Sequence, residues 1–164
     1  MEENLPKFIN YKLSNDYIRG LTDGEGCFTF TTTNKTTDKE GNIFTPKIPT
    51  FTLSMNVRDR WLIVSVADYL GIGGNVYIHK NWKGDGYNRG DMAKFMVRSA
   101  KELQNIIIPF FYKKLAGYKG DQFIEWLEKI GTNPEVPERY KIIHRLYKSG
   151  YWETKENIPE KFRN

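Results

Sequence analysis

The sequence predicts an α+β fold in which helices cover one face of an antiparallel sheet. Apolar residues recur at alternate positions in four segments and at helical spacing in the others. The order is helix, two strands, helix, two strands and then helices, without the strand–helix–strand repeat of a parallel sheet. We therefore expect four antiparallel strands whose apolar face meets the helices and whose other face is open.

The first helix is expected over residues 15–25, because Ser14 offers an N-terminal cap and Gly26 follows the last turn. Residues 27–35, CFTFTTTNK, alternate between apolar and hydroxyl side chains, which is typical of a half-buried strand. Residues 36–42, TTDKEGN, predict a turn, and alternation returns over 49–57.

The second half of the chain contains the remaining elements. A helical period over 58–71 ends at Gly71. A hairpin of two strands and three helices follow, with Pro109 near the end of the first of these helices. The strands are expected at 75–82 and 92–99, and the helices at 100–111, 118–130 and 137–150.

The composition suits one domain, expected at residues 1–150, with residues 151–164 as an appended tail. A net charge of +5 favours polyanionic partners, although many basic domains are merely soluble. The single Cys27 cannot form an intramolecular disulfide, and no His and Cys cluster has zinc-finger spacing. With neither a secretory or transit signal nor an apolar membrane span, we expect a soluble, unsecreted protein with no membrane partner.

The open face of the sheet is expected to be rich in hydroxyls and edged with cations. Such side chains bond base edges and phosphates, and strands fit the major groove, although threonine is also common on solvated sheet faces. Alternation places these residues outward: Thr29, Thr31, Thr33, Thr50, Thr52, Ser54, Tyr77, His79, Lys94, Met96 and Arg98.

Further cations and aromatic residues lie in or beside the predicted loops at the ends of the sheet. Together they favour a nucleic-acid interface, because phosphate contacts supply affinity while the sheet supplies register. The cations are Lys35, Lys47, Lys80, Lys83 and Arg89, and Trp82 and Tyr87 accompany them.

Two acidic residues, Asp23 and Glu25, stand in the last turn of the first helix, although a helix C-terminus favours cations. Gly20 and Gly24 share one helix face, where a second backbone can approach closely. Since the chain has one such helix, a symmetric dimer would bring Glu25 near its copy, and a hard divalent cation would relieve the repulsion. The alternative is that Asp23 and Glu25 only cap or solvate the turn.

The stretch YIRGLTDGEGCF, residues 17–28, resembles the signature of the LAGLIDADG homing endonucleases. FTLSMN, YLGIGGNVY and IIPFF are similar, in order and spacing, to later elements of that family, so the resemblance spans residues 14–130. It implies an α-β-β-α-β-β-α saddle with extra C-terminal helices. It also implies a homodimer that cuts both strands of a long, roughly palindromic DNA duplex with Mg²⁺, for which Ca²⁺ or Mn²⁺ substitute in binding.

The resemblance assigns roles by position. Glu25 becomes the metal-binding catalytic carboxylate, Gly24 lends a backbone carbonyl, and Asp23 supports the helix end beside Gly20 at the dimer interface. Lys119 resembles the basic residue near the scissile phosphate. A second basic residue falls at Arg58 or Arg60.

Two positions depart from the family pattern. Met55 stands where a glutamine that orders water is common, and Arg19 stands where the family has a small alanine. We expect Arg19 to be exposed near the interface or the DNA backbone. Met55 favours a second hypothesis, an RNA maturase acting on intron RNA or a non-cleaving binder. A third is a monomeric α+β domain.

The composition, rich in Lys, Asn, Ile, Tyr and Phe, suggests an AT-rich gene such as an organelle intron. An intron-encoded protein of a mitochondrion or chloroplast needs no transit peptide. A bacterial cytoplasmic origin fits equally.

Overall fold

The computed structural model describes residues 12–81, 84–87 and 89–164. The predicted α+β class is confirmed, with one four-stranded antiparallel sheet and several helices. The helices are α1 (Asn15–Glu25), α2 (Arg60–Tyr69), α3 (Ala100–Glu102), α4 (Ile108–Phe111), α5 (Tyr118–Thr132) and α6 (Lys141–Lys148). The strands are β1 (Gly26–Thr32), β2 (Thr36–Thr37), β3 (Ile43–Phe44), β4 (Lys47–Asn56), β5 (Val76–His79) and β6 (Met92–Val97).

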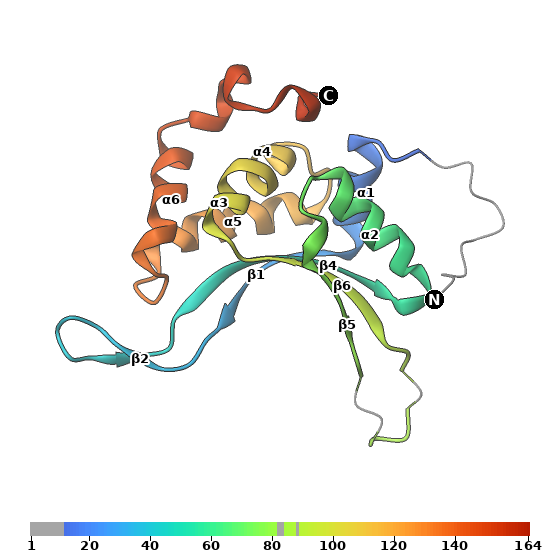
Figure 1. The fold of residues 1–164 in the computed structure, drawn as a ribbon. Coiled ribbons are helices and arrows are strands. Elements are labelled where there is room, and N and C mark those ends of the chain that lie inside the picture. The colour runs from blue at the N-terminus through green and yellow to red at the C-terminus, as the bar shows by residue number, and fades with distance from the viewer. Residues whose placement is uncertain (1–11, 82–83, 88) are drawn as a thin grey trace.

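The main sheet has the order β1-β4-β6-β5, and every neighbouring pair is antiparallel. Figure 1 shows this sheet as an arch, with the helices gathered over its convex side. The β2–β3 arm and the β5–β6 hairpin bend away from the helices at the two ends. The concave side therefore has the form of a saddle and faces away from the helical layer.

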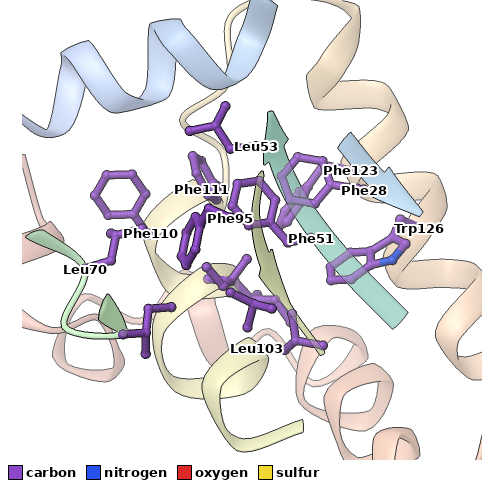
Figure 2. Close-up of a cluster of buried hydrophobic side chains, with 14 of the residues drawn as sticks. Phe28, Phe51, Leu53, Leu70, Phe95, Leu103, Phe110, Phe111, Phe123 and Trp126 are labelled. Atoms are coloured by element: carbon purple, nitrogen blue, oxygen red, sulfur yellow. The ribbon is translucent and has the colours of Figure 1, made fainter. Parts of the chain in front are cut away.

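The core lies between the sheet and the helices and is dominated by aromatic rings (Figure 2). The ring centroid of Phe28 on β1 lies 5.2 Å from that of Phe51 on β4 and 4.9 Å from that of Phe123 on α5. The indole N–H of Trp126 also donates to the carbonyl of Thr29, 2.8 Å away. These contacts fix α5 against the strand that follows the acidic helix end.

The segment expected to be a simple turn at 36–42 is instead the tip of a short two-stranded arm. Thr36 pairs with Phe44 and Thr37 with Ile43, while the Asp38 carboxylate accepts from the backbone N–H groups of Glu40 and Asn42. The β-branched pair before the turn and Ile-Phe after it are the sequence signals for this arm.

The helix expected over 100–111 is interrupted by a π-helix at Leu103–Ile107. Proline has no backbone N–H, and its ring clashes with the carbonyl four residues earlier in a regular α-helix. The wider π turn precedes Pro109, and the N–H of Ile108 bonds to the carbonyl of Leu103.

The tail expected to be an appendage packs on the helices instead. It forms short 3-10 helices at Tyr151–Glu153, Lys155–Asn157 and Glu160–Phe162. Trp152 and Phe162 are buried in the core, and the ring centroid of Phe162 lies 5.0 Å from that of Phe110. Figure 1 shows this segment on the side of α4 that faces away from the sheet.

Candidate nucleic-acid interface and metal site

The acidic end of α1 is built as predicted. Ser14 caps the start by accepting from the N–H of Tyr17, and the N–H of Gly26 donates to Thr22 at the end. The carbonyl of Gly24 lies in the last turn of α1, where backbone carbonyls have no hydrogen-bond partner within the helix. Glu25 is exposed and has no hydrogen-bond or ion-pair partner among residues 12–81, 84–87 and 89–164.

The Asp23 side chain makes hydrogen bonds within its own chain. Its carboxylate accepts from the backbone N–H of Ala116 at 3.0 Å and from that of Gly117 at 3.3 Å. These bonds join the end of α1 to the start of α5, where Lys119 is the second helical residue. Asp23 therefore keeps the helix end that carries Glu25 next to the helix start that carries Lys119.

The Gly20 and Gly24 face of α1 is open. Both glycines are exposed, and a Cβ added at either one would meet no atom within 4 Å. Neither glycine is therefore required by packing inside this chain. The face has room for the backbone of another helix.

The expectation for Arg19 is wrong, because its side chain is buried rather than exposed. Arg19 is 3% exposed, and Nε donates to the carbonyl of Phe110 at 3.0 Å. Nη2 donates to Phe162 at 2.8 Å, and Nη1 donates to the carbonyl of Asn164. Burial lowers the pKa of the Arg19 guanidinium from its ordinary value, and Asp16 partly opposes this. Arg19 thus ties α1 to α4 and to the C-terminal segment.

The strand register confirms the predicted outward face. Thr29 pairs with Thr50, Thr52 with Met96, Ser54 with Lys94, and Tyr77 with Lys94. Directly paired residues share a face of the sheet, so these residues lie together on the concave side. The register also places Cys27 and Asn56 on this face, as the alternation of their strands predicts, and adds Met92, which the sequence argument did not place.

Two predicted contact residues are placed differently from the expectation. Thr50 lies on the outward face, but it is completely buried, and its hydroxyl bonds to Thr31 and to the carbonyl of Ile48. Lys47 shares the helix-side face with Phe51, and its amine lies 3.5 Å from the carboxylate of Glu135. Thr50 and Lys47 are therefore already engaged within the chain.

The remaining outward residues form the margin of the concave face. Tyr77 is 42% exposed, and its hydroxyl bonds to the sulfur of Met96 at 3.2 Å. Burial raises the pKa of the Tyr77 phenol, and Arg98 opposes this. The exposed margin residues are Thr33, Lys35, His79, Lys80 and Arg98.

The loop between β5 and β6 carries one further predicted cation. Arg89 is exposed, pairs with Asp85 at 2.7 Å, and lies over the ring of Tyr87. Trp82 and Lys83 lie outside the described residues.

The two alternative basic positions, Arg58 and Arg60, follow the end of β4, and both are exposed. Arg58 pairs with Asp59 at 3.5 Å. Met55 pairs with the buried Ala93, so its side chain belongs to the helix side of the sheet. The polar residue on the concave side at this strand end is Asn56.

The end of α1 offers oxygen donors of the kind that a hard cation prefers, but too few of them to hold the cation alone. Glu25 offers a carboxylate and Gly24 a carbonyl, both oxygen donors that suit Mg²⁺ or Ca²⁺. Within the described part of the chain, no group of three or more His, Cys, Asp or Glu side chains gathers as a metal site. A site centred on Glu25 therefore requires donors from outside this single chain.

Comparison with known proteins identifies the family. The model of the family described as LAGLIDADG endonuclease matches residues 18–130, so this chain belongs to that family. No helix in the described ranges is long and apolar enough to cross a membrane.

Solved structures support the same fold. I-SmaMI bound to an uncleaved DNA target with calcium ions is 27% identical, with a TM-score of 0.58 over 89% of this chain and 48% of that chain. I-CpaMI bound to uncleaved DNA is 19% identical, with a TM-score of 0.61 over 93% of this chain and 47% of that chain. I-LtrWI bound to target DNA is 24% identical, with a TM-score of 0.58 over 93% of this chain and 43% of that chain. This chain spans about half the length of these proteins.

Proposed function

We propose that the chain is a site-specific DNA endonuclease that acts as a homodimer and hydrolyses phosphodiesters with Mg²⁺. The observation that carries this proposal is the exposed Glu25 at the end of α1, beside the open face of Gly20 and Gly24. Family membership and the DNA-bound state of I-SmaMI support it.

The concave face is proposed to bind a long duplex. Hydroxyls on the central strands face the bases, while cations such as Lys35, Lys80 and Arg98 at the margin reach phosphates. Two copies related by a two-fold axis read a roughly palindromic target.

The proposed catalytic groups meet where α1 from each copy ends. Glu25 and the Gly24 carbonyl supply oxygen ligands, and when bound, a divalent ion polarises a phosphoryl oxygen and acidifies the attacking water. Lys119 is held beside this helix end through Asp23 and is proposed to orient the scissile phosphate. Arg58 and Arg60 are proposed as additional cations near the same phosphate.

The test is the substitution Glu25→Gln, which removes one negative charge and keeps the side-chain shape. We expect cleavage of a target plasmid with Mg²⁺ to fall by at least about a thousandfold, while duplex binding at fixed salt stays within about threefold. Cleavage is measured as nicked and linear product over time.

Glu125→Gln is the matched control, because Glu125 is an exposed glutamate on α5 whose carboxylate has no hydrogen-bond or ion-pair partner among the described residues. It should cut at the wild-type rate. Undiminished cleavage by the Glu25→Gln protein would contradict the assignment.

The non-cleaving alternative rests on Met55, at the position where a water-ordering glutamine is common in the family. Met55 lies on the helix side of the sheet, while the polar Asn56 faces the concave side at the same strand end. A competition between duplex DNA and RNA at one salt concentration distinguishes the two functions, and we expect duplex DNA to win.

A further inference from the structure

A cavity of about 230 Å³ lies between residues 109–114 and the C-terminal segment 152–163. Its wall combines aromatic residues with a set of charges. The aromatic residues are Tyr112, Trp152 and Phe162, and the charged residues are Lys113, Lys114, Glu153, Lys155 and Arg163.

The charges of this cavity leave an excess of cations. Glu153 pairs with Lys113 at 2.6 Å and accepts from the hydroxyl of Tyr112 at 2.8 Å. These two partners lower the pKa of the Glu153 carboxyl, so its charge is present and already neutralised by Lys113. Lys114, Lys155 and Arg163 remain. Arg163 Nε donates to the carbonyl of Ile158, and within the described residues neither lysine amine has a hydrogen-bond or ion-pair partner.

The backbone at Lys113 is strained. Its φ is +56°, and it is the one non-glycine residue in the described ranges with positive φ. Glycine adopts this conformation at no steric cost, whereas other residues give up about 1 kcal/mol or more. The Lys113 amine neutralises Glu153 in this conformation, which leaves the neighbouring cations uncompensated.

A second hollow of about 310 Å³ adjoins the first, because Pro109 and Trp152 line both. Its lining is polar and carries no cation, with the amides of Gln104, Asn105 and Asn157 and the carboxylate of Glu156. Gln104 and Asn105 lie on the π-helix that precedes Pro109. Amide and carboxylate groups of this kind bond the edges of nucleobases, and a carboxylate accepts from an exocyclic amine.

We propose that the two hollows together bind one nucleotide, with its phosphate against Lys114, Lys155 and Arg163. The base then lies against Gln104 and Asn105. Glu156 favours a base with an exocyclic amine, such as adenine, and repels a phosphate from this end. The nucleotide is either free or a unit of a single-stranded RNA. This site lies away from the concave face that is proposed to bind duplex DNA.

The test titrates the full chain with AMP, adenosine, inorganic phosphate and UMP, using calorimetry. We expect AMP to bind at least about tenfold more tightly than any of the other three, because adenosine lacks the phosphate, inorganic phosphate lacks the base, and UMP lacks the exocyclic amine that would donate to Glu156. The double substitution Lys114→Ala/Lys155→Ala should weaken AMP binding by about tenfold or more and leave DNA cleavage unchanged.

The matched control is Lys101→Ala/Lys129→Ala, which changes the net charge equally at two exposed lysines outside the cavity. It should leave AMP binding unchanged. Asn105→Leu should weaken AMP but not phosphate, which separates the base contact from the phosphate contact.

The source of the nucleotide is distinguished with a fluorescent, single-stranded adenine-rich RNA. Displacement of this RNA by AMP assigns the site to a strand, and AMP binding without RNA binding assigns it to a free nucleotide. The proposal is overturned if no probe binds, if phosphate binds as tightly as AMP, or if the control variant weakens AMP as much as the cavity variant.

Discussion

Arg19 is a buried guanidinium that joins α1 to α4 and to the C-terminal segment. Substituting a buried donor leaves its acceptors without partners, at about 1–3 kcal/mol for each unsatisfied group. Arg19 donates hydrogen bonds to the carbonyls of Phe110, Phe162 and Asn164, and the last two belong to the C-terminal segment.

We predict that Arg19→Met lowers the free energy of unfolding by about 2–4 kcal/mol, because the methionine fills part of the space but donates no hydrogen bond. Urea denaturation followed by tryptophan fluorescence measures the change. Arg58→Met is the control, because Arg58 is exposed, and it should shift stability by less than about 0.5 kcal/mol. A similarly small shift for Arg19→Met would contradict this account.

Residue roles were predictable where they follow from local spacing. The cap at Ser14 and the acidic end at Glu25 depend on neighbours within one helix turn. The role of Arg19 depends on Phe162 and Asn164, more than 140 positions away, and nothing in the local pattern marks that contact. The Lys47–Glu135 pair was missed for the same reason.

At the scale of elements, α5 and α6 are joined by a cluster centred on Glu128. Its carboxylate accepts from Lys148 and lies 3.3 Å from Nε2 of His144. The hydrogen bond from Lys148 is the main cause that lowers the pKa of Glu128, and His144 adds to it. The ionised carboxylate is therefore the form that stabilises the fold.

The sign of the pH dependence follows from that lowered pKa. A carboxyl with a depressed folded-state pKa contributes its stability above the unfolded-state value and loses it as the pH falls through the folded-state value. We predict that Glu128→Gln is less stable than wild type at neutral pH, and that the difference shrinks towards zero below about pH 4. Urea midpoints across that range measure it. A difference that stays constant or grows with acidification would contradict the role of Glu128, and Glu125→Gln is the matched control.

Elements were predictable in proportion to the strength of their periodicity. Strict alternation in β4 and β6 predicted which residues lie on the concave face, and the β4–β6 register agrees with that prediction. The π-helix before Pro109 has no signal in hydrophobic spacing, because Leu103, Ile106 and Ile107 follow the i, i+3, i+4 spacing of an ordinary α-helix. The β2–β3 arm is too short for alternation to show.

At the scale of the whole molecule, the central claim is that two copies of α1 pack through Gly20 and Gly24. In the proposed function each saddle contributes one Glu25, and a second α1 would bring a second Glu25 for the other DNA strand. The packing of a single chain leaves both glycines uncovered.

Gly20→Gln separates folding from association. Glutamine is a better helix former than glycine, and a Cβ at this position meets nothing within the chain, so the variant should fold with at least wild-type stability. The added side chain blocks the close approach of a second helix, so DNA cleavage should be lost together with association.

Sedimentation equilibrium of the wild-type protein and the Gly20→Gln variant is the most direct test of this claim. We predict twice the chain mass for the wild type and a folded species of single chain mass for the variant. A wild-type protein that remains monomeric at concentrations where it cuts DNA, or a variant that still dimerises, would contradict it.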